Sequence, residues 1–163
     1  MGAGPKGKPP RETTDVRPYS HVLDRLRTAG LRPTRQRLAL ARILFDCDHG
    51  RHVTAEILHA DALNQNIRVS LATVYNTLHQ FTEAGLLKEI VVDASRSYFD
   101  TGIHPHHHFF YEATGQLEDI MPEQIQIAKL PQAPDGMAIR SIELVIRLAP
   151  ANQDERRSAM AAE

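Results

Sequence analysis

The chain has 163 residues, 42% hydrophobic and 24% charged, with a net charge of −1, so it can bury a core and is not a disordered tail. No apolar run reaches about 18 residues, and the opening MGAGPKGKPP lacks a signal segment, which predicts a soluble, cytoplasmic protein that does not engage a membrane. The single cysteine, Cys47, excludes an internal disulfide and any zinc site built on two thiolates, so metal ligands would be nitrogen and oxygen.

The small net charge hides an uneven distribution along the chain. Residues 1–92 carry 13 Lys and Arg against 9 Asp and Glu, whereas residues 93–163 carry 6 against 11. Six arginines of the basic half fall within 18 residues: Arg25, Arg27, Arg32, Arg35, Arg37 and Arg42. This density is typical of a surface that neutralises nucleic-acid phosphates, although the solvated face of a helical pair would give the same pattern.

Four helices are predicted between residues 19 and 85, because apolar residues recur there at helical spacing. The first spans 19–29 and stops at Gly30, and the others begin at the N-capping residues Thr34, Thr54 and Ser70. The second reaches residue 46, and the fourth ends at Gly85. Apolar residues on the inward faces are expected to be Val22, Leu23, Leu26, Leu38, Ala41, Phe45, Ile57, Leu58, Leu63, Leu71, Val74, Leu78 and Phe81.

After Gly85 the pattern changes to that of extended strands. The runs LLKEIVV and SRSYFD predict a β-hairpin that turns at residues 93–95. Helices followed by a hairpin indicate a winged helix, in which the fourth helix enters the major groove of DNA and the hairpin touches the backbone. The outward residues of that helix would be Thr73, Tyr75, Asn76 and His79.

The remaining sequence predicts a small α/β unit. HHHFFYE and QLEDI read as two strands around an ATG turn, followed by a short helix over 123–130 and a long strand over 137–149. These strands are too few for an independent core, and Ile142, Leu144 and Ile146 alternate as in a strand that pairs with a partner's sheet. A homodimer is therefore expected, which also suits groove-reading modules.

The predicted fold class is α+β, with an N-terminal winged-helix DNA-binding domain followed by a small α/β dimerisation domain. The expected organisation is a flexible basic arm over 1–16, the winged-helix domain over 17–101, the dimerisation and sensing domain over 102–149, and a flexible tail over 150–163.

Four of the nine histidines lie within the five residues from His104 to His108, where the two halves meet. Residues two apart on a strand share a face at roughly 6.5 Å, so His106 and His108 can converge on one ion while His107 points away. A solvent-exposed His-rich loop is the other interpretation. Asp100 and His52 would supply an oxygen and a third nitrogen, but sequence spacing alone does not bring them close.

Several of these segments together resemble one protein family. RHVTAEILH, SLATVYNTLHQFTEAGLL, a hairpin ending in YFD and the His-rich strand are similar to the ferric uptake regulator family of metal-sensing repressors, over about residues 23–148. Within that family, the chain resembles the iron response regulator branch of alphaproteobacteria in its HHHFF strand and in its lack of further cysteines.

The resemblance implies a sensory metal site at His52, Asp100, His106 and His108. His52 would belong to the DNA-binding domain and the other two histidines to the dimerisation domain, so an ion would act as a clamp on the angle between them. Manganese or iron is the expected ion, with zinc as an alternative. The family's structural zinc site is not expected, because its CxxC positions are Tyr111 and Thr114 here.

The resemblance also implies roles in DNA binding and haem sensing. Tyr75 would pack on a thymine methyl, Arg32 would reach the minor groove or a phosphate, and Arg37 would contact the backbone of an AT-rich inverted repeat in double-stranded DNA. Asn76 stands where many relatives have arginine. The branch is thought to sense haem, for which the axial ligands would be His106, His107 and His108.

The expected function is a sequence-specific DNA-binding transcriptional regulator of iron and haem homeostasis that responds to haem or a divalent metal, with no catalytic residues and no small-molecule substrate. A metallo-hydrolase would use the same histidines, but the chain lacks an H-E-x-x-H helix, a Gly-rich phosphate loop and a nucleophile elbow. A metal-storage protein would not need the arginine-rich half. A regulator whose metal is only structural, or one that senses manganese or zinc, stays open.

Overall fold

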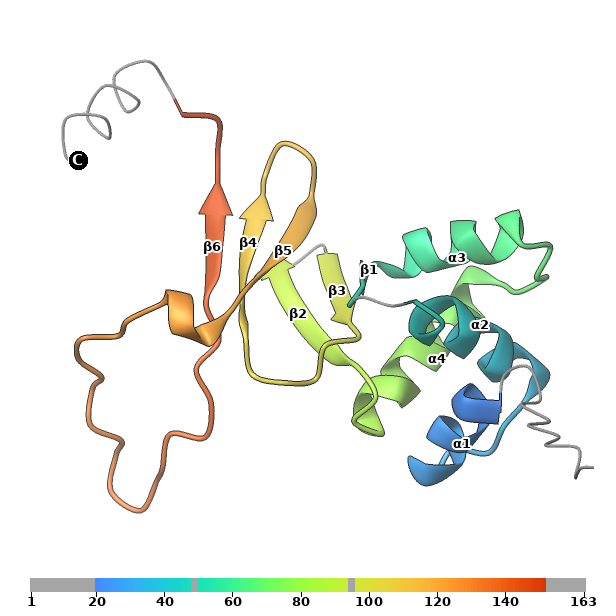
Figure 1. Cartoon of the computed structure of the whole chain (residues 1–163), viewed down its shortest axis with the longest axis horizontal. Helices are drawn as coiled ribbons and strands as arrows, with labels where there is room; N and C mark the ends of the chain where they lie inside the picture. Colours follow the sequence, from blue (N-terminus) through green and yellow to red (C-terminus); the bar gives the residue numbers. More distant parts are fainter. Residues whose placement is uncertain (1–19, 48–49, 94–95, 152–163) are drawn as a thin grey trace, which may run out of the picture.

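The computed structural model describes residues 20–47, 50–93 and 96–151, so the expected arm over 1–16 and most of the tail over 150–163 lie outside the described residues. Four helices, with the short strand β1 between the second and the third, precede the other strands, and the second sheet comes last (Figure 1). The elements are α1 Ser20–Thr28, α2 Arg35–Phe45, β1 His52–Val53, α3 Ala55–Asn64, α4 Leu71–Glu83, β2 Lys88–Asp93, β3 Arg96–Asp100, β4 His107–Tyr111, β5 Gln116–Ile120, a 3-10 turn Pro122–Gln124 and β6 Val145–Leu148.

The helix boundaries follow local capping signals and agree with the prediction. The side-chain oxygens of Thr34, Thr54 and Ser70 accept hydrogen bonds from backbone N–H groups three residues later, at 3.2, 3.3 and 3.1 Å. Gly85 follows α4 with a φ of +72°, a conformation that glycine adopts without steric cost, and the chain turns there into β2.

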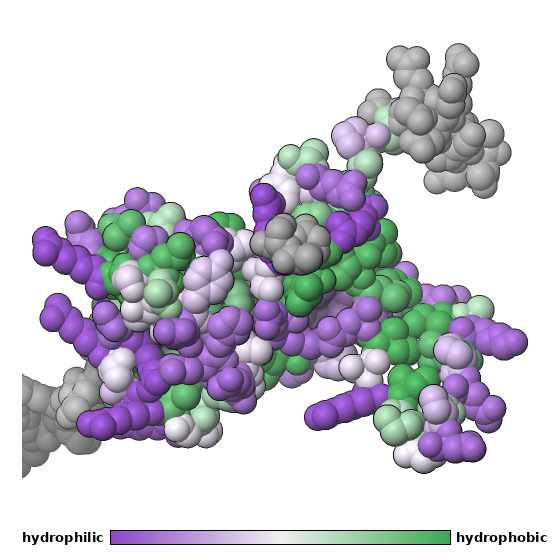
Figure 2. Space-filling model, turned by 180° about the vertical axis from the view of Figure 1, so that it is seen from behind, coloured by the Kyte–Doolittle hydropathy of each residue, from purple (hydrophilic) through white to green (hydrophobic). Residues whose placement is uncertain are grey.

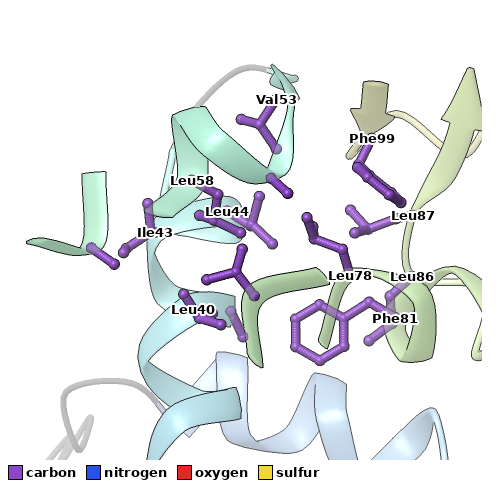
Figure 3. Close-up of a cluster of buried hydrophobic side chains, with 14 of the residues drawn as sticks. Leu40, Ile43, Leu44, Val53, Leu58, Leu78, Phe81, Leu86, Leu87 and Phe99 are labelled. Atoms are coloured by element: carbon purple, nitrogen blue, oxygen red, sulfur yellow. The ribbon is translucent and has the colours of Figure 1, made fainter. Parts of the chain in front are cut away.

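The first half is a winged helix built on a single apolar core. Leu40 and Leu44 of α2, Leu58 of α3, and Leu78 and Phe81 of α4 meet at its centre (Figure 3). Phe99 of β3 and Leu87 close this core from the sheet side, so the hairpin is packed against α4. The predicted fold class, helices and a wing followed by a small sheet domain, is confirmed.

The expected inward faces of α3 and α4 were partly wrong. Ile57 and Leu63 are 44% and 52% exposed, and Leu71, at the start of α4, is 36% exposed. The buried residues of α3 are Ala55, Leu58 and Ala62, whose spacing of three and four defines a different stripe on the helix. Small residues at two of these three positions let α3 lie close to the core, which turns the larger Ile57 and Leu63 outward.

Two three-stranded sheets follow each other along the chain, with strand orders β1-β3-β2 and β5-β4-β6. In the first sheet β1 and β3 are antiparallel, and in the second β4 is antiparallel to β5 and parallel to β6. The predicted domain boundary at residue 101 falls between β3 and β4. It stays a prediction, because a second apolar cluster of Ile90, Val92, Tyr98 and Phe110 joins the two sheets.

The predicted helix over 123–130 and strand over 137–149 are wrong as stated. Only a 3-10 turn forms at Pro122–Gln124, and the strand is limited to Val145–Leu148, where β4 provides a neighbour. An eight-residue helix with no packing partner is too short to persist in water, and a strand without a neighbour leaves its backbone groups unpaired. None of the described helices combines the length and apolar content that a bilayer crossing requires.

Candidate metal centre

Five histidine and aspartate side chains converge between the two sheets. One ligand atom from each lies within 4.8 Å of all the others, and we call this group the junction cluster: His52, Asp100, His106, His108 and Asp119. Three ring nitrogens and two carboxylate oxygens therefore surround a common point. Two of the residues come from the first sheet, and three come from the second sheet or the segment just before it.

Strand pairing explains how residues so far apart in sequence meet. His52 of β1 lies directly opposite Asp100 of β3, and His108 of β4 lies directly opposite Asp119 of β5. Directly opposed residues on antiparallel strands project to the same face of a sheet. Each sheet thus contributes one histidine and one aspartate, and His106 joins its neighbour His108 from two residues earlier.

The facing ligand atoms of the cluster lie close to one another, but they cannot all form hydrogen bonds with each other. Nε2 of His52 lies 2.9 Å from Oδ1 of Asp119, and Nε2 of His106 lies 2.9 Å from Oδ2 of Asp100. Nε2 of His108 is 3.6 Å and 3.7 Å from the same two carboxylates. All five facing atoms are shielded from solvent and lack a well-formed hydrogen bond. Buried polar atoms without partners are costly, and a shared cation would satisfy all of them at once.

Neighbouring backbone groups orient two of the ligands. The ring Nδ1 of His106 lies 2.8 Å from the carbonyl of His104, which favours the tautomer with a proton on Nδ1 and leaves Nε2 free to bind a metal. The Gly102 N–H donates to Oδ1 of Asp100 at 2.7 Å, so Oδ2 faces the cluster. A Cβ at Gly102 would lie 3.2 Å from both Asp100 and His106, so only glycine fits beside these ligands without moving them.

Burial and charge set the protonation of the cluster at neutral pH. Burial lowers the pKa of His52, and the nearby Asp100 and Asp119 carboxylates only partly offset this effect, so its imidazole is neutral and can bind a metal. Burial by itself raises the pKa of the Asp100 carboxyl, but the facing His108 ring and the Gly102 hydrogen bond outweigh it and hold that pKa below its ordinary value. The ionised Asp100 carboxylate beside the neutral His52 imidazole is the state that attracts a divalent cation.

The lowered pKa of His52 predicts that the metal-free protein loses stability as the pH falls. Below about pH 6.5 the unfolded chain protonates this imidazole, whereas the folded chain does not, so the unfolded state binds more protons and is favoured. Thermal unfolding of metal-free protein between pH 7.5 and 5.5 measures the effect. His52→Gln, which cannot titrate, should show a shallower fall in Tm, and an equal fall would assign the pH dependence to other groups.

The structure brings the four expected ligands, His52, Asp100, His106 and His108, into one group and adds a fifth. Asp119, which the sequence analysis did not single out, has a side chain 33% exposed and lies at the solvent side of the cluster. His107 points away from it, as expected on a strand, and its Nδ1 accepts a 3.4 Å hydrogen bond from the Leu144 N–H. His104 is exposed and contributes only its carbonyl.

The expected base-reading residues lie along the exposed side of α4. Tyr75 is 38% exposed, and its hydroxyl donates to a Glu56 carboxylate oxygen of α3 at 2.6 Å. This hydrogen bond lowers the pKa of Glu56. The Thr73 hydroxyl lies 2.8 Å from the capping hydroxyl of Ser70, and Asn76 is exposed.

The side chain of Arg37 links α2 to α4. Its Nε and Nη2 donate to the side-chain oxygen of Gln80 in α4, at 3.0 and 2.7 Å, and its Nη1 donates to the Arg32 carbonyl at 2.8 Å. All three guanidinium nitrogens therefore have a partner within the chain. The Arg32 side chain, by contrast, is exposed in the segment between α1 and α2.

Comparison with known proteins relates this arrangement to metal-responsive regulators. A model of the ferric uptake regulator family matches residues 28–147, which include the whole junction cluster. The peroxide-responsive repressor PerR of Staphylococcus aureus is 32% identical over 125 residues, covering 74% of this chain and 83% of that protein. The structure of the ferric uptake regulator from Pseudomonas aeruginosa with manganese is 25% identical, with a TM-score of 0.61 over 80% of this chain and 98% of the other. The ferric uptake regulator from Francisella tularensis with iron shares the fold, with a TM-score of 0.59 at 19% identity over 78% and 96% of the two chains.

Proposed function

The chain belongs to the ferric uptake regulator family of metal-responsive transcriptional regulators, and we propose that a divalent ion in its junction cluster controls how tightly it binds DNA. One observation carries the proposal: five buried, unpartnered ligand atoms from two different sheets face a common point. An ion there would contact the DNA-binding half through His52 and Asp100, and the other half through His106, His108 and Asp119.

The ion would act by fixing one angle between the two halves. Without it, two aspartates and three histidines face one another with ligand atoms that lack hydrogen-bond partners, and opening the cluster to water would satisfy these atoms. With it, five ligands from both sheets hold the halves together, and only that arrangement places two recognition helices at the spacing of one operator. The hydrogen bond from the Tyr98 hydroxyl of β3 to the Gly115 carbonyl, just before β5, is 2.6 Å long and also links the two halves.

Manganese or ferrous iron fits the donor set better than zinc. Five nitrogen and oxygen donors converge, whereas protein zinc sites usually take four ligands, and carboxylates suit the harder ions. The manganese named in the related structure that is 25% identical is in line with this choice. Zinc, or an ion with a purely structural role, is the alternative.

DNA is the proposed partner, and an AT-rich inverted repeat the proposed operator. Thr73, Tyr75 and Asn76 of α4 would face the bases, while Arg32 and Arg37 flank the helix on the basic half. The arginine-rich sequence before and within α2 would supply much of the non-specific attraction to phosphate.

A homodimer is proposed because the second half leaves a broad apolar surface exposed. Figure 2 shows apolar side chains gathered over β6 and the segment that precedes it. A soluble monomer rarely exposes so many large apolar side chains on one side. The residues concerned are Met121, Ile127, Leu130, Met137, Ile139 and Ile146. Pairing of two copies here would cover them and give two-fold symmetry to match an inverted repeat.

Haem is the finer proposal for the regulatory ligand, in line with the resemblance to the iron response regulator branch. His106, His107 and His108 are buried, and two of them aim Nε2 at the junction cluster. Haem could therefore coordinate these imidazoles only after the cluster has opened and lost its ion. Haem and a divalent ion would compete, and haem would release DNA. A response to peroxide is a second candidate, because a relative 32% identical carries that description.

A DNA-binding assay on full-length protein tests the proposal. Fluorescence anisotropy would compare metal-free, Mn²⁺-, Fe²⁺- and Zn²⁺-loaded protein on a labelled AT-rich inverted repeat. We expect two chains per duplex and an affinity about 5–150-fold higher with Mn²⁺ or Fe²⁺. Haem added at fixed Mn²⁺ should lower the affinity, and peroxide added to the Fe²⁺ form tests the second candidate. Equal affinities in all metal states would reduce the ion to a structural role.

A further inference from the structure

We propose that a second site, a cavity between α2 and the segment that leads into α4, holds phosphates of the DNA backbone and so fixes α4 in the groove. This inference rests on the proposed DNA-binding function but not on its metal control. The cavity has a volume of about 680 Å³ and opens between α2 and the segment that joins α3 to α4. We call it the arginine cavity, because Arg35, Arg42 and Arg68 line it together with Leu38, Ala39 and Ile67.

The charge of the lining favours an anion. Three guanidinium groups and no acidic side chain line the cavity, although Asp and Glu are as frequent as Lys and Arg in the chain as a whole. Other arginines of this half are paired: Arg51 with Asp61 at 2.7 Å, and Arg27 with Asp24 at 3.8 Å. Arg35 and Arg68 are exposed and form no ion pair within the described ranges. Like charges around one cavity repel each other, and a bound phosphate would relieve that repulsion.

The backbone adds to the same positive potential. Arg35 is the first residue of α2, and Arg68 lies two residues before Ser70, the N-cap of α4. Neither helix has an acidic residue in its first turn, so the partial positive charges of both N-termini are uncompensated. The cavity therefore combines guanidinium donors with the N-terminus of α2, whose first residues Arg35 and Gln36 line it.

The ligand that suits this lining is a sugar–phosphate backbone. Arg35 and Arg68 would bind phosphate oxygens, and Leu38 and Ile67 offer apolar contact to a deoxyribose. Because the segment containing Arg68 leads directly into α4, a phosphate bound there would hold the start of the recognition helix at one depth in the groove.

Contacts of Arg37 extend this hold to the last turn of α4, which contains Gln80. Its guanidinium joins α2 to Gln80 of α4 by two hydrogen bonds of 2.7 and 3.0 Å, so the two helices form one rigid unit. Arg37 is thus engaged inside the protein, and Arg35 and Arg68 are the residues positioned for the phosphates. They would bind the DNA backbone and carry no sequence information, so their removal should weaken binding uniformly.

The salt dependence of DNA binding tests this assignment. Full-length, Mn²⁺-loaded Arg35→Gln and Arg68→Gln would be titrated with an unrelated duplex and with an AT-rich inverted repeat over a range of NaCl. The slope of log K against log salt should become shallower by about 0.9 for each phosphate that a protomer no longer neutralises, equally on both duplexes. Arg68→Lys should keep the wild-type slope. The matched control Arg140→Gln removes the same charge from an exposed position outside the winged helix; sedimentation would first verify that the variant is still a dimer, and its slope should then equal that of the wild type.

Two outcomes would overturn the proposal. Slopes of Arg35→Gln and Arg68→Gln equal to that of Arg140→Gln would show that the cavity does not hold DNA phosphates. If inorganic phosphate raises the Tm of the wild type but not of Arg68→Gln, while the DNA slopes stay equal, the cavity takes a free phosphate compound instead. Absence of any Mn²⁺ effect on DNA affinity would contradict the proposed metal control and leave the slopes, and this site, untouched.

Discussion

Replacing Asp100 or Asp119 by asparagine is expected to lower Mn²⁺ affinity by about ten- to a hundredfold and to abolish metal-dependent DNA binding. Asparagine keeps the shape of the side chain but removes the negative charge, and the ion then faces three neutral imidazoles and one carboxylate. Asp100 is fully buried, so it has no substitute ligand from solvent. Isothermal titration of Mn²⁺ into metal-free protein, followed by DNA binding at the same Mn²⁺ concentration, measures both effects.

Glu118→Gln is the matched control for the Asp119 variant. Glu118 precedes Asp119 on β5, so it projects to the opposite face of the strand and lies outside the junction cluster. The control should bind Mn²⁺ like the wild type. Wild-type affinity in Asp119→Asn would remove this residue from the site, and wild-type affinity in Asp100→Asn would contradict the site as a whole.

Tyr75→Ala is expected to erase most of the discrimination between operator and unrelated DNA, by about 1–3 kcal/mol, or about 5–150-fold. The ring projects from α4 with its hydroxyl occupied by Glu56, so the part presented to DNA is the apolar face that can pack on a thymine methyl. Competition of operator against random duplex, at fixed salt and saturating Mn²⁺, measures the ratio of affinities.

Two further variants separate base reading from phosphate binding. Tyr75→Phe keeps the ring and should retain most of the discrimination. Arg32→Ala should weaken binding to operator and to random duplex alike, because an exposed guanidinium contacts phosphate or the minor groove. If Arg32→Ala and Tyr75→Ala reduced discrimination equally, the division of roles between these two residues would be wrong.

The first half of the fold was predictable because its signals are local. Each N-cap, Thr34, Thr54 and Ser70, hydrogen-bonds within three residues of itself, and Gly85 ends α4 through its own backbone freedom. The periodicity of apolar residues did not predict which face of α3 is buried. Two alanines permit close packing at positions that hydrophobicity alone ranks below Ile57 and Leu63.

The candidate site was predictable only in part, because it depends on strand register. His106 and His108 share a face by the two-residue period of a strand, and this needs no knowledge of the rest of the chain. Asp119 could have been found from the hairpin: pairing of Tyr111 with Gln116 around the turn places His108 opposite Asp119. His52 and Asp100 are 48 positions apart, and no local signal predicts that the two-residue strand β1 pairs with β3.

The last part of the chain departed from prediction for a different physical reason. Residues 125–142 carry apolar side chains at intervals that suit a helix and a strand, yet they form no helix or strand and pair with no strand of the described chain. The proposed homodimer would supply that neighbour. Under this proposal, the sequence pattern describes a surface that a second copy would cover.

In the proposed mechanism, an ion in the junction cluster and bound DNA favour the same arrangement of the two halves. Thermodynamic linkage then requires DNA to tighten Mn²⁺ binding by the same factor by which Mn²⁺ tightens DNA binding. The most direct measurement is therefore the Mn²⁺ affinity of the wild type, without DNA and with a saturating duplex selected in vitro by the Mn²⁺-loaded protein. We expect the Mn²⁺ Kd to be about 5–150-fold lower in the complex with DNA, and to show no such change in Asp100→Asn. The same Mn²⁺ Kd with and without DNA would contradict the proposed control of DNA binding by the ion.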